Sequence, residues 1–353
     1  MAKKQKEKDP LSCRLGKVGG QAVIEGVMMK SGEDMAIASR MPDGSIKLTK
    51  DKFVSVRKKF KILNIPLLRG VVNFVEMMIL SYKTLSVSTE ALGIDEEEEL
   101  TRFEKWLMKK FGKSIMTFIM ILSTILGLLL ALFLFTVLPT ASTSGIDFLI
   151  NKFSGGKYCI DGYWVSVIEG ILKVTIFIVY LALVSLMGDI KRTFQYHGAE
   201  HKSVFCYEKG LDLTVENVKK QSRFHPRCGT SFMFMMILLS IIIGIFLPSD
   251  DKILRVLLKI ALLPLSVGLG FEFIMLAGKH PNPVTNALSV PGLWMQHLTT
   301  KEPDEKQIEC AIAAIKAALP DEFPEEVKED TEENTEENEE NEEQKETDGA
   351  ENI

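Results

Sequence analysis

The chain has 353 residues, enough for two or three domains, and a net charge of −5. Its five cysteines are unevenly spaced, which excludes a disulfide framework. The charged start MAKKQKEKDP has no apolar run behind it and excludes an ordinary cleaved signal peptide. We treat 1–13 as a flexible N-terminus and expect membrane insertion to depend on an internal segment.

A small β-rich unit is predicted over residues 14–61. Ala22–Val27 is a short apolar run typical of a strand, and Met35–Arg40 and Ile46–Lys50 flank the turn Pro42-Asp43-Gly44. Its glycines indicate sharp turns or close backbone approach. They do not form a phosphate-binding loop, because no Gly-Lys-Ser or Gly-Lys-Thr ends the run.

Region 62–114 is predicted to be amphipathic and helical. Residues 66–93 begin at Pro66 and include Arg69 and Glu76, so their apolar stretch is too short for a clear membrane span. We expect this helix to lie in the membrane interface or to pack on the other helices, with entry into the bilayer as the alternative.

The region 115–277 contains four predicted spans. Ile115–Leu138 is 24 residues without a charge, longer than the roughly 30 Å hydrocarbon core requires. Trp164–Met187 contains Glu169 and Lys173, which share a helical face. These two either pair inside the bundle, or the span begins later with Glu169 near the interface.

The third and fourth spans are Ser231–Leu247 and Ile253–Ala277, joined by a tight hairpin. Pro264 and neighbouring glycines predict a kink in the fourth span. The sequence thus predicts a mainly α-helical membrane protein, a four-span bundle with a small cytosolic β-rich N-terminal unit and a disordered acidic C-terminal tail.

Lysines and arginines set the expected orientation. They precede the first span and crowd segment 188–230, whereas the 139–163 loop has only Lys152 and Lys157. We therefore place both termini and segment 188–230 on the cytoplasmic side of a bacterial plasma membrane. No sequence-specific nucleic-acid partner is predicted.

The C-terminal part divides into a cytosolic segment, 278–320, with an amphipathic helix over 302–319, and an acidic tail, 321–353. The tail holds 17 acidic residues and two lysines, a net of −15, so residues 1–320 carry +10. It has too little apolar surface to offset the entropy of ordering, and we expect a disordered arm. A solubilising role is the simpler interpretation, and partner binding is the alternative.

Tyr196-His197-Gly198-Ala199-Glu200-His201 is the densest group of residues that could carry chemistry. His197 and His201 are four apart, so a helix continuing from the second span projects both imidazoles from one face, the spacing that supplies two metal ligands. Glu200 completes an H-x-x-E-H pattern, which in inverted zinc peptidases supplies the residue that activates water. This pattern alone has low specificity.

His225 and Cys228 add an imidazole and a thiol at the entry to the third span. A thiolate there gains from the helix N-terminus. Four ligands would suit structural zinc, and three ligands plus water would suit catalysis. The alternative is a buried polar cluster in which the histidines are satisfied by Glu200, Glu208 and the backbone.

Several other residues are weaker candidates. Arg223 and Arg227 could hold a phosphate such as a lipid headgroup, but compliance with the positive-inside rule explains them more simply. Cys206 could be a nucleophile near a base, although packing is the usual role of such a thiol. His280 could be a further ligand or a proton carrier, and His297 is expected to pack at the interface beside Trp294.

Five motifs are long enough to be specific: GGQAVIEGVMMKS (19–31), IPLLRGVVNF (65–74), YHGAEHK (196–202), SRFHPRCGTSF (222–232) and KHPNP (279–283). They resemble motifs of the bacterial YqhQ-like membrane proteins, and the resemblance covers about residues 14–318. It implies a membrane protein of the kind described as a predicted metal-dependent enzyme, and it implies no assigned catalytic residue.

We therefore predict a divalent transition metal, zinc first, held by His197, His201 and one or both of His225 and Cys228. Glu200 would be the general base of a hydrolysis acting on a lipid-linked compound or a membrane protein.

Two other classes remain open. One is a non-enzymatic assembly or translocation factor whose basic cytosolic face contacts a ribosome, nascent chain or partner protein. The other is a transporter, with Glu169, Lys173 and Glu272 as its candidate pathway. Four spans in one chain would then require a homo-oligomer.

Overall fold

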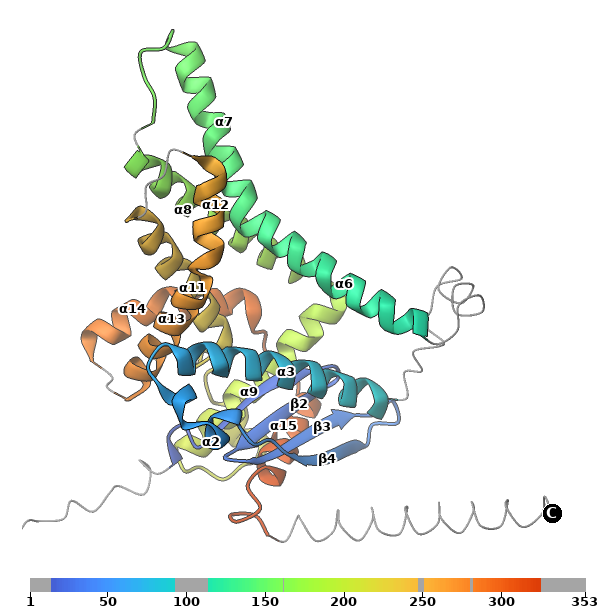
Figure 1. Cartoon of the computed structure of the whole chain (residues 1–353). Helices are drawn as coiled ribbons and strands as arrows, with labels where there is room; N and C mark the ends of the chain where they lie inside the picture. Colours follow the sequence, from blue (N-terminus) through green and yellow to red (C-terminus); the bar gives the residue numbers. More distant parts are fainter. Residues whose placement is uncertain (1–13, 93–113, 161, 247–250, 280–281, 325–353) are drawn as a thin grey trace, which may run out of the picture.

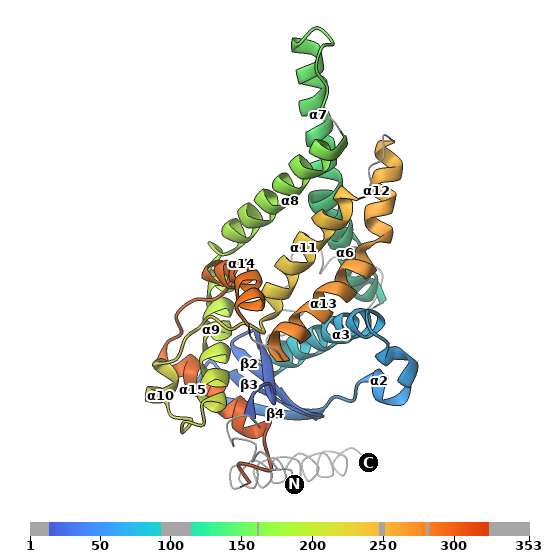
Figure 2. The same cartoon turned by 90° about the vertical axis from the view of Figure 1, so that its left-hand side faces the viewer.

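The computed structural model describes residues 14–92, 114–160, 162–246, 251–279 and 282–324 (Figure 1). It is mainly helical, with one four-stranded sheet near the start of the chain. The long apolar helices extend away from the sheet on one side (Figures 1 and 2). The prediction of a mainly helical fold with a β-rich N-terminal unit is confirmed at this level.

The sheet is antiparallel, and its strand order follows the chain. The predicted strand Ala22–Val27 is wrong, because Ile24 and Glu25 form the turn between the first two strands and Glu25 adopts a φ of 50°. Both faces of the sheet are covered, so residues 26–29 and 35–39 are buried on both sides, and the apolar run hides this turn. The strands are β1 (Val18–Val23), β2 (Gly26–Ser31), β3 (Asp34–Arg40) and β4 (Ile46–Lys52).

The predicted hairpin between β3 and β4 is confirmed. Arg40 pairs with Ile46 across the ladder, and Gly44 adopts a φ of 93° that suits glycine. The carboxylate of Asp43 accepts hydrogen bonds from the backbone N–H of Ser45 at 2.8 Å and from its hydroxyl at 2.7 Å. This turn depends on local chemistry alone, and the sequence therefore shows it.

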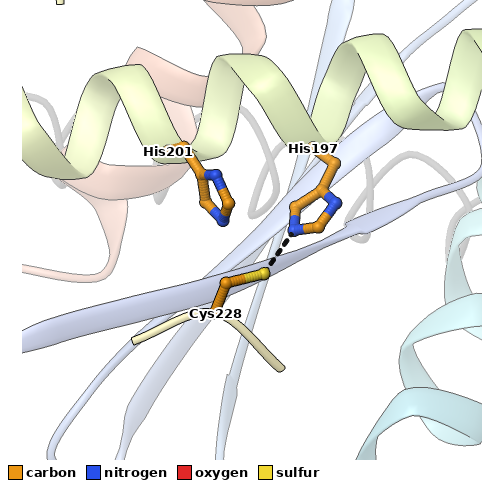
Figure 3. Close-up of side chains that lie close together, drawn as sticks. All are labelled: His197, His201 and Cys228. Atoms are coloured by element: carbon orange, nitrogen blue, oxygen red, sulfur yellow. Dashed lines mark hydrogen bonds between the residues drawn. The ribbon is translucent and has the colours of Figure 1, made fainter. Parts of the chain in front are cut away.

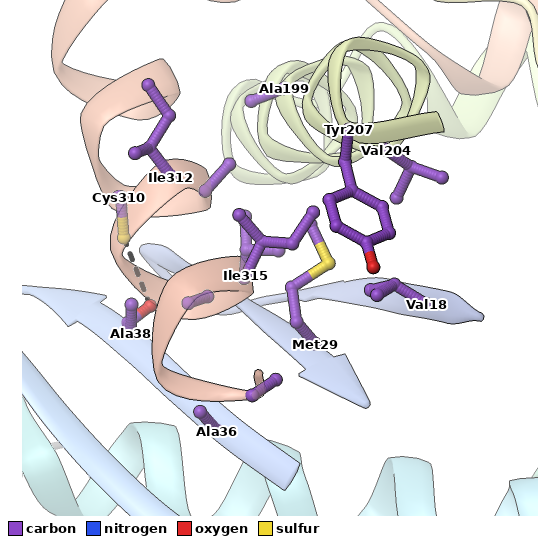
Figure 4. Close-up of a cluster of buried hydrophobic side chains, with 14 of the residues drawn as sticks. Val18, Met29, Ala36, Ala38, Ala199, Val204, Tyr207, Cys310, Ile312 and Ile315 are labelled. Carbon is purple, nitrogen blue, oxygen red and sulfur yellow. Dashed lines mark hydrogen bonds between the residues drawn. The ribbon is translucent and has the colours of Figure 1, made fainter. Parts of the chain in front are cut away.

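One face of the sheet packs against two helices that are distant in sequence, α9 (Gly188–Glu208) and α15 (Glu305–Ala317). Val18 and Met29 belong to this core together with Tyr207 and Ile315 (Figure 4). The strands bury alternate residues on each face. The predicted C-terminal amphipathic helix is thus confirmed as α15, capped by Asp304.

The other face packs against α3 (Leu68–Ala91), which runs across the sheet (Figure 1). Leu80 joins a second buried cluster with Met28 and Ile37 of the sheet. Arg69 forms an ion pair with Glu272 of a later apolar helix, with 2.6 Å between Nε and Oε1. The predicted helix over 66–93 is confirmed, and it joins the sheet to the apolar helices. Two short helices precede it, α2 (Val56–Lys59) and a 3₁₀ turn (Lys61–Asn64).

The first apolar helix is longer than predicted. It comprises α6 (Ser114–Leu132), a π-helical segment (Phe133–Val137) and α7 (Leu138–Phe153). The predicted loop from Pro139 is therefore wrong up to Phe153. Proline removes a helical N–H and its ring crowds the preceding turn. The wider π turn directly before Pro139 accommodates that ring, so the helix continues.

The second apolar helix, α8 (Gly162–Val184), matches the predicted span to within three residues. It does not continue into α9, because Met187 adopts an extended conformation between the two. Of the two alternatives for Glu169, the structure does not show the pairing with Lys173. Glu169 pairs with Lys259 and, at 3.6 Å, with Arg255, whereas Lys173 donates to the hydroxyl of Ser240 at 3.2 Å.

The predicted kink in the fourth span is confirmed. α12 (Lys252–Ala261) and α13 (Leu263–Lys279) meet at a bend of 41°. Two described helices are long and apolar enough to cross a membrane, Leu122–Phe153 and Gly162–Val184, and the bent pair makes a third if it is one span. α11 (Gly229–Ile245) has 17 residues, about 26 Å, and is shorter than a usual span. The predicted hairpin falls mostly on 247–250, outside the described residues.

The chain after α13 contains a helix that the sequence did not predict, α14 (Pro283–Thr299). It packs against α8, α11 and α13. A short helix, α10 (Val215–Lys219), lies between α9 and α11. Residues 325–353, most of the predicted acidic tail, lie outside the described residues. At the start of that tail, Glu322 accepts a hydrogen bond from the hydroxyl of Tyr207 at 2.7 Å.

Candidate metal centre

Two histidines and one cysteine meet where α9 passes the first turn of α11. His197 and His201 lie one turn apart on α9, and Cys228 directly precedes α11. One ligand atom from each lies within 4.8 Å of the other two (Figure 3). This group could hold a metal ion, because these atoms are close enough to share one.

Backbone carbonyls orient both imidazoles. The Nδ1 atom of His197 lies 2.9 Å from the carbonyl oxygen of Thr299, and that of His201 lies 2.5 Å from the carbonyl oxygen of Arg223. A carbonyl oxygen only accepts, so each Nδ1 carries the hydrogen. In the neutral ring, each Nε2 then keeps its lone pair for a metal. Metal-binding histidines usually have this support.

The thiol of Cys228 lies between two polar partners. Its Sγ atom is 3.3 Å from Nε2 of His197 and 3.1 Å from the hydroxyl of Thr230. Burial alone would raise the pKa of Cys228, but His197 and His201 outweigh burial and hold this pKa well below its usual value. Burial likewise tends to lower the pKa of His197, and the charge of Cys228 outweighs it, raising the pKa to about 9. The pair therefore favours the thiolate, the form that binds metals.

Glu200 lies beside the group and is not one of its three members. Its side chain is buried, with Oε2 3.4 Å from Nε2 of His201. It faces β1 at Gly20, where a Cβ atom would lie 3.0 Å from Cγ of Glu200 and 2.5 Å from a backbone oxygen. Glycine is needed there because a larger residue would displace the helix that carries the site. The predicted close approach of the backbone is confirmed at this glycine.

His225 is buried near the group but outside it. Its ring centroid lies 5.6 Å from that of His201, and its Nδ1 accepts a hydrogen bond from the backbone N–H of Arg227 at 3.3 Å. Its Nε2 therefore carries the hydrogen, and it faces the carboxylate of Glu208 at 3.6 Å. The structure thus brings together three of the four predicted ligands.

Arg223 and Arg227 are both engaged by protein groups. Arg223 donates to the carbonyl oxygen of Thr300 and lies 3.7 Å from a carboxylate oxygen of Glu302. Arg227 forms an ion pair with Glu208. Both guanidinium groups therefore position the segment between α10 and α11 relative to its neighbours.

Sequence reasoning missed the contribution of α14 and the residues after it. Gln296 is fully buried and binds both backbone groups of His225, each at 2.7 Å. Thr299 supplies the carbonyl that orients His197. The sequence does contain a signal for the start of α14. Asn282 and Thr285 form a capping box, and Pro283 stands at the first helical position, where proline is common.

The remaining candidates lie elsewhere. Cys206 is buried, its pKa is raised by burial and by Asp212, and its Sγ lies 3.4 Å from the carbonyl oxygen of Asp212, so it packs rather than reacts. His297 is exposed and stacks on Phe224 with 4.4 Å between ring centroids. His280 lies outside the described residues.

Comparison with known proteins assigns the chain to a family. Residues 65–321 match a family described as "Protein of unknown function (DUF1385)", and all three members of the candidate metal group lie within this match. The chain is 37% identical over 308 residues to the "Uncharacterized protein YqhQ" of Bacillus subtilis (strain 168), covering 85% of this chain and 92% of that protein. No solved structure matches. The chain belongs to the DUF1385 family, and it is a homologue of YqhQ.

Proposed function

We propose that this protein is a membrane-embedded, metal-dependent hydrolase whose ion is held by His197, His201 and Cys228. The observation that carries the proposal is the approach of their three ligand atoms to within 4.8 Å. The carbonyl oxygens that fix both Nδ1 atoms support it, because they leave both Nε2 atoms available to a metal. A merely buried polar cluster does not require this arrangement.

The donor set suits zinc best among divalent transition metals. Two imidazoles and one thiolate are ligands that zinc accepts in tetrahedral sites. Because His225 lies outside the group, the ion would have three protein ligands. Its fourth coordination position would be left for water or substrate. Three protein ligands are typical of catalytic zinc sites, whereas structural sites have four.

Zinc in such a site supplies a Lewis acid that polarises a carbonyl or phosphoryl oxygen and makes water more acidic. Glu200 is the proposed general base, because its Oε2 lies 3.4 Å from a ligand atom of the group and its side chain is buried. Its carboxylate takes a proton from the attacking water. The water oxygen bonds to the substrate, and the leaving group departs with that proton.

We further propose a multi-pass arrangement in a bacterial cell membrane, with both termini on the cytoplasmic side. The four spans would be the α6–α7 helix, α8, α11 and the bent α12–α13 pair. The candidate site lies at the sheet-proximal end of α11 (Figure 2). That location favours a lipid-linked compound or a membrane protein as substrate, because either can reach a site at the bilayer surface.

The proposal is tested by measuring metal in the purified full-length protein. Elemental analysis should find about one zinc, iron or manganese ion per chain. His201→Ala and Cys228→Ser should each lose it, because two remaining ligands bind weakly.

The matched control is His297→Ala, which removes an exposed histidine outside the group and should retain the metal. Wild-type protein without stoichiometric metal, even after incubation with zinc, would refute the proposal. Equal metal content in the wild type, the two ligand variants and the control would also refute it.

A further inference from the structure

A second polar site lies among the apolar helices, at the end remote from the sheet. Glu169 of α8 is only 3% exposed, and it pairs with Lys259 and Arg255 of α12. Lys173, one turn further along α8, donates to Ser240 of α11 at 3.2 Å. Three cationic side chains therefore gather around one carboxylate between apolar helices.

A cavity opens beside this cluster. The charged residues among its described lining are all cations, and Glu169 is not among them. Three hydroxyl groups stand around the same space. The polar lining is Thr136, Lys173, Ser240, Arg255, Lys259 and Ser266.

Glu169 pairs with both Lys259 and Arg255. Lys173 has no described carboxylate within ion-pair distance, and its ammonium has three hydrogens of which Ser240 accepts one. Ionised groups between apolar helices are costly unless they are paired, so an anion in the cavity would stabilise this arrangement.

We propose that this cavity binds a phosphate-class anion, taken from a phospholipid headgroup or from free phosphate. Phosphate oxygens accept several hydrogen bonds at once, and lysine ammonium groups and hydroxyls are suitable donors. Ile243, Leu258 and Leu262 form apolar walls next to these donors, as a lipid would require.

The anion site is separate from the candidate metal centre. Gly244 lines the cavity near the end of α11, and Cys228 lies just before its start. At 1.5 Å per residue, about 24 Å of helix separate them. Figures 1 and 2 show α12 at the opposite end of the molecule from the sheet. Loss of one site therefore need not affect the other.

The experiment uses the full-length protein in two arms. In the first, protein in nanodiscs of phosphatidylcholine, with or without phosphatidylglycerol, is released and its bound lipids are counted by native mass spectrometry. In the second, protein in neutral detergent is heated with inorganic phosphate or with chloride at equal ionic strength. The proteins compared are wild type, Lys173→Gln, Lys173→Arg and the control Lys152→Gln, which alters an exposed lysine of α7.

Wild-type protein should retain phosphatidylglycerol or be stabilised by phosphate. Lys173→Gln should weaken that binding about tenfold, because a hydrogen bond to a charged group is lost. Lys173→Arg should preserve it, and Lys152→Gln should have no effect. Retained phosphatidylglycerol identifies a headgroup as the source, and stabilisation by inorganic phosphate alone identifies free phosphate.

Absence of both effects in wild type would overturn the proposal, as would equal binding by Lys173→Gln or an equal loss in Lys152→Gln. If Lys173→Gln does not fold, Ser240→Ala replaces it. This variant removes the hydroxyl that holds the ammonium and should also weaken binding, and unchanged binding there would likewise overturn the proposal.

Discussion

The Sγ atom of Cys228 lies 3.3 Å from Nε2 of His197, although the two residues are 31 positions apart. This contact forms because the segment between α9 and α11 folds back, with His225 held by Gln296. A cysteine sulfur so close to an imidazole nitrogen either shares a proton with it or shares a metal ion.

Zinc should protect Cys228 from alkylation. In metal-free protein, iodoacetamide should modify this thiol, because a lowered pKa favours the reactive thiolate. Cys310 should stay unmodified, since burial raises its pKa to about 12. Mass spectrometry of the peptides gives both rates in one sample. Zinc that leaves the rate at Cys228 unchanged would mean that this sulfur is not a ligand.

Glu200→Gln should retain the metal and lose catalysis. The amide cannot take a proton from water, and Glu200 is not a member of the ligand group. Hydrolysis of p-nitrophenyl acetate by zinc-loaded protein should fall at least about a hundredfold, a usual contribution of a general base. Metal content and melting temperature should match wild type.

The control for Glu200→Gln is Glu90→Gln, which changes an exposed carboxylate of α3 and should keep full activity. Unchanged activity in Glu200→Gln would remove this residue from the mechanism. Absence of hydrolysis in wild type as well would favour a non-enzymatic role, such as an assembly factor.

The pattern of two histidines on α9 and a cysteine before α11 was predictable because helix geometry fixes it. Residues four apart share a face, and a residue that precedes an apolar helix lies at its end. The position of His225 outside the ligand group was not predictable, because it depends on the conformation of the loop around it. The carbonyl of Thr299, 102 residues from His197, is likewise a tertiary contact with no local signal.

Gly198→Ala should disturb the site through the backbone. An added Cβ would lie 2.1 Å from the carbonyl oxygen of Lys301, next to the residues that hold the histidines. Overpacking of this kind costs about 1–3 kcal/mol. Melting temperature and zinc affinity should both fall.

The matched control for Gly198→Ala is Gly188→Ala on the same helix, where nothing lies within 4 Å of the added Cβ. It should not destabilise the protein, since alanine favours helix. If both variants melt at the same temperature, the close approach at Gly198 is not needed.

The fold shows the same division between local and distant causes. The β3–β4 hairpin was visible because Asp43 and Gly44 specify a turn by themselves. The β1–β2 turn at Glu25 has no clear sequence signal, because α3 and α9 cover both faces of the sheet. The continuation of the α6–α7 helix past Pro139 was not predictable, because a π turn accommodates the proline ring. The packing of α15 on the sheet depends on segments too far apart for any periodicity to relate them.

Acid should weaken the attachment of Glu322. Burial tends to raise the pKa of this carboxyl, and hydrogen bonds from Lys17 and Tyr207 outweigh it, holding the pKa below the usual 4.5. A depressed pKa contributes stability that is present above 4.5 and lost as pH falls through the folded-state value. Glu322→Gln should therefore melt below wild type at pH 7, and the gap should close in acid. A gap that persists or widens below pH 4.5 would contradict this assignment.

The most direct test of the metal centre is X-ray absorption at the zinc edge on the zinc-loaded, full-length protein. The account predicts one sulfur at about 2.3 Å and two nitrogens at about 2.0–2.1 Å. In Cys228→Ser the sulfur shell should disappear. A spectrum with only oxygen neighbours, or a sulfur shell that survives in Cys228→Ser, would contradict a site built from His197, His201 and Cys228.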